Sequence, residues 1–347
     1  MTKYVIKRVV LAFISLFIIL TLTFLLMKTL PMDIPQGTTP EVKLAFLKTQ
    51  VSNGYLIEST SLITGYGNPI ASVKLLNSST TYYYYNRPIM DQYGSWLKAI
   101  FTRWDWGTSY SVDVGKNCMD IILRGLPYTI KVNVIAVIIS VPLGILLGIV
   151  AALNKNKTTD NVISTLVMVF ISVPSFVLIT FMIMIFGYNL KWLPTEWPKS
   201  YHSLGQKALG YIIPVIALSL GAICGYCRFT RAELCDVLSS DYLLLARTKG
   251  LTKKQSVIRH ALRNAMVPIL PSILAEIIGV LSGSMILESL YNIPGIGTVY
   301  IDALNKRDYN LLMVDMALFT MIGLLAGIVL DLSYGFLDPR IRMGEKK

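Results

Sequence analysis

The chain has 347 residues, of which 54% are hydrophobic and only 15% are charged, and its formal net charge is +12. Soluble domains carry about 25% charged residues, so these proportions indicate a membrane protein with positive cytoplasmic loops. The sequence has no basic patch interleaved with aromatic residues, which argues against a nucleic-acid-binding protein.

The first predicted span covers residues 9–27, "VVLAFISLFIILTLTFLLM". This run is long enough to cross about 30 Å of hydrocarbon as a helix. Three basic residues precede it and no small-residue cleavage pattern follows it, which distinguishes it from a removed signal peptide. We expect an uncleaved helix whose N-terminus lies in the cytoplasm.

Residues 31–127 contain no apolar run of spanning length but include the aromatic stretches "TTYYYYNRP" and "FTRWDWGTSYS". We predict that this segment is an extracellular insertion. Its aromatic side chains either contact a partner protein or form the core of a small extracellular cap.

Five further spans are predicted downstream: 128–153, 162–188, 209–226, 265–290 and 311–336. The second span contains Gly144 and Gly148, a spacing that favours close packing of helices in lipid. Pro174 interrupts the third span, and proline inside a helix kinks or breaks it.

Six spans place both termini on the same side, and the basic residues identify that side as the cytoplasm. Short predicted cytoplasmic segments hold most of the lysines and arginines: Lys3, Lys7 and Arg8; Lys155 and Lys157; the eight in 228–263; and Arg340, Arg342, Lys346 and Lys347. We expect three parts: 1–30 with the first span, the insertion 31–127, and a five-helix core 128–347 with a cytoplasmic loop at 227–264.

Cysteines and histidines do not form a recognisable catalytic or metal site. Cys224 and Cys227 make a C-x-x-C, but no second pair or histidine cluster completes a zinc site. The two histidines, His202 and His260, lie in different predicted loops. We expect neither a bound metal nor an enzyme.

The stretch 239–270, "SSDYLLLARTKGLTKKQSVIRHALRNAMVPIL", predicts two short cytoplasmic helices that meet at a glycine. Ser239 or Ser240 is suited to cap the first helix, and Asp241 lies in its first turn, where a carboxylate is favourable. Gly250 is suited to the left-handed residue that ends a helix.

Thr252 and Gln255 have the spacing of a capping box that begins the second helix, which we expect to run toward Pro268. The segment "YLLLA" in the first helix is apolar although it lies outside the spans. An apolar helix face outside the membrane favours docking into the groove of a partner protein. The alternative is a solvated loop whose charges only fix the topology.

This stretch resembles the cytoplasmic loop of permease subunits of ATP-binding-cassette importers, in the variant found in the oligopeptide/dipeptide/nickel permease family. "YVIKRVV" at the start, "SLYNIPGIGTVYIDALNKRDY" after the fifth span and "DPRIR" at the end extend the resemblance to the B-type of the two permease subunits. The usual loop pattern is Glu-Ala-Ala, three residues and Gly; here Ala246 matches the second alanine, whereas Leu244 and Leu245 replace the other two.

The resemblance implies an all-α membrane protein with the type I ABC importer permease fold, six transmembrane helices and the insertion between helices 1 and 2. It also implies that the helix–glycine–helix is the coupling element to an ATPase. The residues expected to couple are Asp241, Tyr242, Ala246, Arg247, Gly250 and Leu251.

The implied partners are a homologous second permease, two ATP-binding subunits, an extracellular substrate-binding protein, the peptide and membrane lipid. The sequence has no G-x-x-x-x-G-K-[ST] phosphate loop. We therefore expect no cofactor in this chain, with ATP and Mg²⁺ bound by the partner subunits.

Glu276 is placed mid-way along the fifth span. A charged side chain at the centre of a bilayer costs roughly 2.5–3.5 kcal/mol, so Glu276 should face a cavity or a partner. It either contacts the amino terminus of a peptide in transit or pairs across the interface with the second permease. By resemblance, Glu288, Pro294, Gly295 and Gly297 lie near the extracellular gate and the docked binding protein; the alternative is a plain turn.

The predicted function is that of a permease subunit of an ATP-driven oligopeptide importer in a bacterial cell membrane. One alternative keeps this architecture but imports dipeptides, nickel or another small solute. Another is a self-contained channel or secondary transporter, which predicts inverted repeats that the sequence does not display. A third, a membrane-embedded enzyme, lacks a catalytic set.

Overall fold

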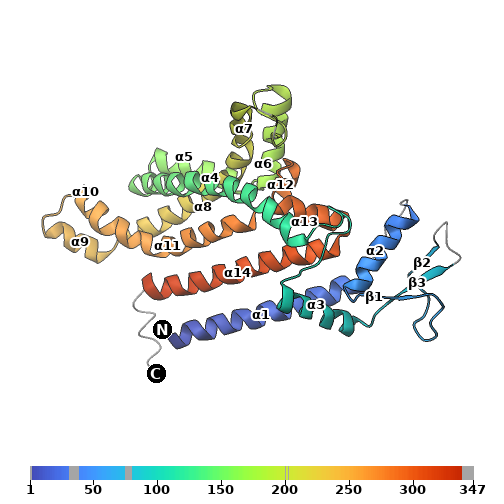
Figure 1. Ribbon diagram of the computed structural model, residues 1–347. Coiled ribbons are helices and arrows are strands. Elements are labelled where there is room, and N and C mark those ends of the chain that lie inside the picture. Colours follow the sequence, from blue (N-terminus) through green and yellow to red (C-terminus); the bar gives the residue numbers. More distant parts are fainter. Residues whose placement is uncertain (1, 31–38, 75–79, 200, 202, 338–347) are drawn as a thin grey trace. The chain divides into compact units, whose positions relative to one another are not determined.

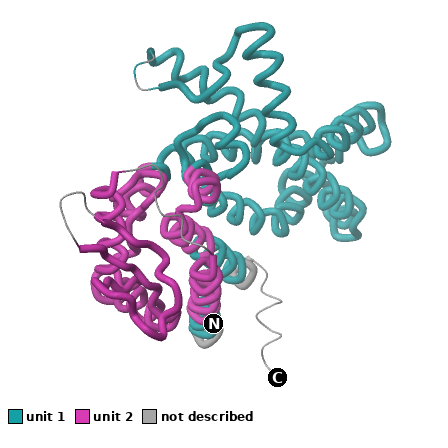
Figure 2. The backbone as a smooth tube through the Cα atoms, turned by 90° about the vertical axis from the view of Figure 1, so that its right-hand side faces the viewer, with its two compact units in different colours: residues 1–12, 125–298, 321–347 teal, residues 13–124, 299–320 magenta. Residues whose placement is uncertain are grey.

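A computed structural model describes the chain except for residues 1, 31–38, 75–79, 200, 202 and 338–347. The predicted "DPRIR" ending, the four C-terminal basic residues and His202 lie outside the described residues. The chain forms two compact units (Figure 2), which are described separately. Unit 1 comprises 1–12, 125–298 and 321–347, and unit 2 comprises 13–124 and 299–320.

Helices α1, α4, α13 and α14, which are labelled in Figure 1, include residues of both units, and the other elements belong to one unit each. The shared helices are α1 (Thr2–Thr29), α4 (Cys118–Leu153), α13 (Ile296–Asn305) and α14 (Tyr309–Leu337). Unit 1 adds α5 (Thr158–Ile171), α6 (Ser175–Met182), η1 (Ile183–Asn189), α7 (Leu204–Leu209), α8 (Ile212–Leu238), α9 (Asp241–Thr248), α10 (Lys253–Ser256), η2 (Val257–Ala261), α11 (Leu262–Gly279), η3 (Val280–Ser282) and α12 (Met285–Leu290).

Helix α8 is the central helix of unit 1. At one end it packs in an apolar cluster with α4, α6 and α12, and further along it packs against α5. Near its C-terminus, Leu234 and Cys235 join α4, α9, η2 and α11 in a third cluster. Helix α8 therefore shares buried apolar clusters with α4, α5, α6, α9, η2, α11 and α12.

The glycine pair in α4 lies against α8, as the spacing predicted. A Cβ atom at Gly148 would lie 2.6 Å from Thr230 Cβ and 2.7 Å from the carbonyl oxygen of Cys227, and one at Gly144 would meet Tyr226 in the same way. Real Cβ atoms do not approach so closely, so only glycine permits this packing of α4 on α8.

Among the described residues, five helices are long and apolar enough to cross a membrane, and the pair α5 and α6 makes a sixth if it is one bent span. The bend is 92° at the break before Pro174, which confirms the predicted interruption. Ser172 donates its hydroxyl to the carbonyl oxygen of Met168 at this break.

Three helices differ in extent from the predicted spans. Helix α4 begins at Cys118 rather than at 128. Helix α8 continues to Leu238, beyond the predicted end of the fourth span at 226. The candidate fifth span begins at Lys253 rather than at 265, passes through Pro268 and ends at Ser282 rather than at 290. It stops there because Gly283 has a φ of +65° and starts a new direction of the chain.

Unit 2 contains α2 (Pro40–Ser52), α3 (Ile89–Arg103) and a three-stranded antiparallel sheet of β1 (Leu56–Ser59), β2 (Ala71–Lys74) and β3 (Thr81–Asn86). The strand order is β1-β3-β2, with Tyr84 opposite both Glu58 and Ala71. Aromatic and β-branched residues favour the extended conformation in β3.

The tyrosine-rich strand forms the core of the insertion rather than an exposed aromatic surface. Tyr84 and Tyr85 are buried, and Tyr84 packs with Phe46 and Leu47 of α2 and with Tyr110. The structure thus supports a core role for the tyrosines of this strand, whereas Phe101 and Trp104 of the second aromatic stretch are 77% and 62% exposed, so contact with a partner stays open for them.

Asp308, between α13 and α14, holds the segment 109–112 through a set of hydrogen bonds to one carboxylate oxygen. Its Oδ2 accepts the hydroxyl of Ser109 at 2.5 Å and the backbone N–H groups of Tyr110, Ser111 and Val112 at 3.0–3.1 Å. The side chain is fully buried. A buried carboxylate with several donors is stable because each donor replaces a lost contact with water.

Candidate functional site

The candidate site is the helix–glycine–helix formed by α9, Gly250 and α10. Gly250 has a φ of +92°, which confirms the predicted left-handed residue. Its N–H donates to the carbonyl oxygen of Arg247 at 3.0 Å, and the N–H of Leu251 donates to that of Ala246 at 3.4 Å. These two bonds form a Schellman motif, which satisfies the last carbonyls of α9.

The second helix begins with the predicted capping box. Gln255 N–H donates to the Thr252 hydroxyl at 3.3 Å, and Thr252 N–H donates to the Gln255 side-chain oxygen at 3.1 Å. The side-chain cap predicted for α9 is wrong. Ser240 is its N-cap residue, but its hydroxyl donates to the carbonyl oxygen of Val237 and therefore caps the end of α8 instead.

Helix α9 is attached to the rest of unit 1 by one buried side chain. Leu243 packs with Leu234 of α8 and Ala261 of η2, while Leu244 and Leu245 are 63% and 56% exposed. Tyr242 is also exposed. The structure thus places an apolar surface at the end of a short helix and outside the helices that could span a membrane.

The predicted coupling residues lie together in this element but differ in their surroundings. Asp241, Tyr242, Arg247 and Gly250 are exposed, and Ala246 and Leu251 are half-buried beside the turn. Arg247 and Asp241 lie at opposite ends of α9, where each charge is favourable to the helix dipole. The exposed surface of α9 therefore consists of apolar side chains with an acidic residue, Asp241, at one end and basic residues at the other.

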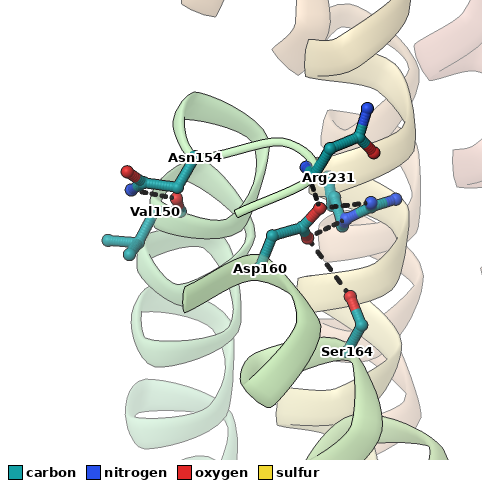
Figure 3. Close-up of polar contacts among 6 residues, drawn as sticks. Val150, Asn154, Asp160, Ser164 and Arg231 are labelled. Carbon is teal, nitrogen blue, oxygen red and sulfur yellow. Dashed lines mark hydrogen bonds and ion pairs between the residues drawn. The ribbon is translucent and has the colours of Figure 1, made fainter. Parts of the chain in front are cut away.

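An ion pair fixes the part of α8 that precedes α9 (Figure 3). Arg231 donates through Nε to Asp160 Oδ1 at 2.5 Å and through an Nη group to Oδ2 at 2.7 Å. Asp160 also accepts the backbone N–H of Asn156 and the hydroxyl of Ser164, and its side chain is 2% exposed. A two-point arginine–carboxylate pair of this kind restricts orientation as well as distance.

This ion pair was not predicted from the sequence. Asp160 and Arg231 are 71 positions apart in the sequence and both lie at the polar ends of apolar helices, where charges are common. The only local signal is that each charged residue adjoins an apolar run. Asp160 lies in α5 with the run that follows it, and Arg231 lies in α8 with the run that precedes it.

Glu276 lies in α11, half-buried, and it does not join a cluster of potential metal ligands. Among the described residues there is no group of three or more His, Cys, Asp or Glu side chains that could hold a metal ion. The four cysteines are buried and none forms a disulfide, and Cys224 and Cys227 pack with Val167 in an apolar cluster.

Glu288 organises the loop predicted to lie at the gate. Its Oε2 accepts the Thr129 hydroxyl at 3.1 Å and Gly297 N–H at 2.9 Å, and Oε1 accepts Ser284 N–H at 3.3 Å. Glu288 is only 2% exposed, and Gly295 and Gly297 are buried.

Of the four residues predicted at the gate, Pro294 alone is exposed. Burial raises the pKa of the Glu288 carboxyl above its usual range, against the opposing effect of the hydrogen bonds that it accepts. Glu288 is therefore a buried hydrogen-bond acceptor that stabilises the loop. Pro294 lies on the surface of the loop, where another molecule can contact it.

Comparison with known proteins identifies the family. Residues 144–343 match the family model described as the binding-protein-dependent transport system inner membrane component. The chain is 30% identical to the dipeptide transport system permease protein DppB of Bacillus subtilis (strain 168), with both chains covered completely. It is 30% identical to the oligopeptide transport system permease protein OppB of Escherichia coli (strain K12), over 99% of this chain and all of that protein.

Among solved structures, an amino acid ABC transporter is similar at 21% identity and a TM-score of 0.46, over 62% of this chain and 92% of that chain. The family model matches more than half of this chain, and the two permeases match essentially its whole length. The chain therefore belongs to the binding-protein-dependent transport system inner membrane component family, the helical membrane-embedded permeases of ATP-binding-cassette importers.

Proposed function

We propose that this chain is a permease subunit of an ATP-driven oligopeptide importer and forms half of the translocation pathway. The support for a peptide cargo is the full-length similarity to permeases named for dipeptide and oligopeptide transport. Dipeptides are the alternative cargo, whereas no relative described above favours nickel.

The observation that carries the coupling proposal is the exposed apolar surface of α9. Tyr242, Leu244 and Leu245 lie exposed on a helix that ends in a rigid Schellman turn at Gly250. A groove of an ATPase subunit would bury this surface, and burying a leucine side chain contributes about 1.5–3 kcal/mol. Asp241, Ala246, Arg247 and Leu251 would complete the contact or hold the turn.

The energy source is proposed to lie in partner subunits, because the sequence has no phosphate-binding loop of its own. The proposed assembly contains a second permease, two ATP-binding subunits that bind ATP and Mg²⁺, and an extracellular substrate-binding protein. We place the assembly in a bacterial cell membrane, with both termini of this chain in the cytoplasm.

Two further roles follow from the same proposal. Pro294 would contact the binding protein or form part of the outer gate, while Glu288, Gly295 and Gly297 hold that loop in shape. Glu276 would face either the peptide or the second permease, since a carboxylate within a span is stable only against protein or water.

Co-purification tests the coupling proposal. The tagged chain is expressed with the genes that accompany it, and the ATPase subunits that elute are quantified. Leu245→Asp should reduce their recovery at least tenfold, because it places a charge in the buried contact. Leu204→Asp, at a leucine of α7 that is 85% exposed, is the matched control and should have no effect. Full recovery with Leu245→Asp, or no ATPase with the unmodified chain, contradicts the proposal.

A further inference from the structure

Unit 2 contains a cleft that the proposed coupling and gate roles do not use. It lies between the turn that joins α2 to β1 and one side of α3, and its volume is about 550 Å³. The polar side chains that matter here are Arg87, Ser95, Lys98, Arg103 and Asp105. All of these belong to unit 2, so the cleft is complete within that unit.

Arg87, which directly follows β3, has an unusual environment. Its Nε is buried and, among the described residues, has no hydrogen-bond acceptor. None of the ion pairs between described residues includes it. Arg87 as a whole is half-buried, but its Nε is a buried donor without a partner, which is unfavourable, and buried donors in native proteins nearly always have one.

The charges around the cleft reinforce this imbalance. Lys98 and Arg103 of α3 add two more cations, and Asp105 is the one carboxylate among the residues that line the cleft. Asp105 is already engaged, because its Oδ1 accepts Gly107 N–H at 2.9 Å and Oδ2 lies 3.8 Å from Arg103. The cleft therefore has an excess of positive charge that Asp105 does not neutralise.

The shape of the cleft depends on a glycine. Gly54 has a φ of +79°, and a Cβ atom there would lie 2.7 Å from the hydroxyl oxygen of Ser95. The turn before β1 thus packs directly onto α3 while the Ser95 hydroxyl remains at the cleft wall. A hydroxyl in a cleft that three basic side chains also line is a suitable additional donor to an anion.

We propose that this cleft is a binding site for a carboxylate, and that its ligand is the C-terminal carboxylate of a short peptide. A planar carboxylate matches the two-donor edge of a guanidinium, which distinguishes it from a simple point anion. The anion site rests on the environment of Arg87. The choice of a peptide as the ligand rests on the proposed function.

The test measures equilibrium binding to the full chain, purified in detergent with whatever subunits accompany it and without ATP. Trialanine is compared with trialanine amide, which is identical except that it lacks the carboxylate. Binding of trialanine that is at least tenfold tighter than binding of the amide supports the proposal; a tenfold ratio corresponds to about 1.4 kcal/mol.

Variants assign the binding to the cleft. Arg87→Met should weaken trialanine binding at least tenfold, and Lys98→Met, at an exposed residue of the cleft wall, should weaken it by a smaller factor. Arg124→Met is the matched control, since Arg124 lies in unit 2 but outside the lining of the cleft. If Arg87→Met does not fold, Lys98→Met and Arg103→Met still decide the question.

Three results overturn the proposal: equal binding of trialanine and its amide, no binding of either, or unchanged binding in the folded Arg87 and Lys98 variants. Displacement of trialanine by inorganic phosphate at lower concentrations than by acetate overturns the choice of a carboxylate. Because the assay needs neither ATP nor transport, its result is separate from the coupling test at α9. If the ATPase subunits fail to co-purify, the binding of trialanine can still be measured. If trialanine does not bind, the recovery of the ATPase subunits still tests the role of α9.

Discussion

Asp308 shows how a single residue determines the structure of a distant loop. Its carboxylate accepts one hydroxyl and three consecutive backbone N–H groups from 109–112, nearly 200 positions earlier in the sequence. Consecutive N–H groups that converge in this way form an anion-binding nest. Here the anion belongs to the same chain.

Asp308→Asn should therefore destabilise unit 2 by about 1–3 kcal/mol, because the amide oxygen is uncharged and the NH₂ group that replaces Oδ1 cannot accept the N–H of Leu311. The expected observations are a lower melting temperature of the purified protein and faster proteolysis within 104–117. Asp91→Asn, at an exposed carboxylate in the first turn of α3, is the control and should change either measurement little. Equal effects of the two substitutions would contradict the importance of the nest.

Glu288 gives a second residue-scale prediction, which concerns pH. Burial raises its pKa in the folded protein above the ordinary value of 4.5. The unfolded chain releases the Glu288 proton near pH 4.5, whereas the folded chain keeps it to a higher pH. The stability contributed by the neutral carboxyl is therefore fully present below pH 4.5 and is lost as the pH rises through the raised pKa of the folded state. The melting temperature should therefore fall with rising pH by more than in Glu288→Gln, when both are measured from about pH 4 to about pH 8. Parallel curves would show that Glu288 does not titrate differently on folding.

At the scale of elements, α8 is held by a close helix contact on one side and an ion pair on another. Gly148 of α4 packs against its backbone, and Asp160 of α5 binds its Arg231. Asp160 is buried but Arg231 is 32% exposed, so breaking this pair costs less than the about 3–5 kcal/mol of a fully buried pair. Both contacts oppose sliding of α8. Since α8 leads directly into α9, the orientation of the coupling element depends on them.

Gly148→Ala should destabilise the protein by about 1–3 kcal/mol, because the added methyl group meets the backbone of α8 and forces the helices apart. Gly225→Ala is the matched control in the same pair of helices, where a Cβ atom meets nothing within 4 Å. That substitution should be neutral or stabilise by about 0.5–1 kcal/mol, the usual gain from alanine within a helix. Thermal unfolding of the two variants in one detergent measures the difference.

Gly250→Val should impair coupling without unfolding the chain. No atom lies within 4 Å of a Cβ atom at this position, so the cost is confined to the left-handed backbone and amounts to about 1–2 kcal/mol. Transport and peptide-stimulated ATP hydrolysis of the reconstituted complex should both decline. Gly250→Asn should preserve more of each, because asparagine tolerates positive φ better. Full activity of the valine variant would exclude a requirement for this turn.

Features determined by neighbouring residues were predictable from the sequence. The apolar runs, the break at Pro174, the left-handed Gly250 and the Thr252 capping box each depend on a few adjacent positions. Contacts between distant positions were not predicted. Asp160 with Arg231, and Asp308 with 109–112, are pairs whose sequence separation leaves no local pattern. The serine cap failed because a hydroxyl can also bond backwards to a carbonyl group, as Ser240 does.

At the scale of the whole molecule, the distribution of basic residues predicts which loops face the cytoplasm. Single cysteines test this directly, because all four native cysteines are buried and should not react. Leu62→Cys, exposed in the predicted extracellular insertion, should react with a membrane-impermeant maleimide on intact cells. Leu244→Cys on α9 should react only after the membrane is permeabilised. The opposite result would invert the proposed topology and remove α9 from the reach of a cytoplasmic ATPase.

The bent pair of α5 and α6 has a consequence for how the chain resides in a bilayer. The break before Pro174 ends the regular helical pairing of peptide groups in α5, and the bonds from Val173 N–H to the carbonyl oxygen of Phe170 and from the Ser172 hydroxyl to that of Met168 replace part of it. Hydrocarbon tails cannot hydrogen-bond to such groups, and each one left bare costs several kcal/mol. This stretch of polypeptide must therefore be shielded from the fatty acyl chains by water or by another protein.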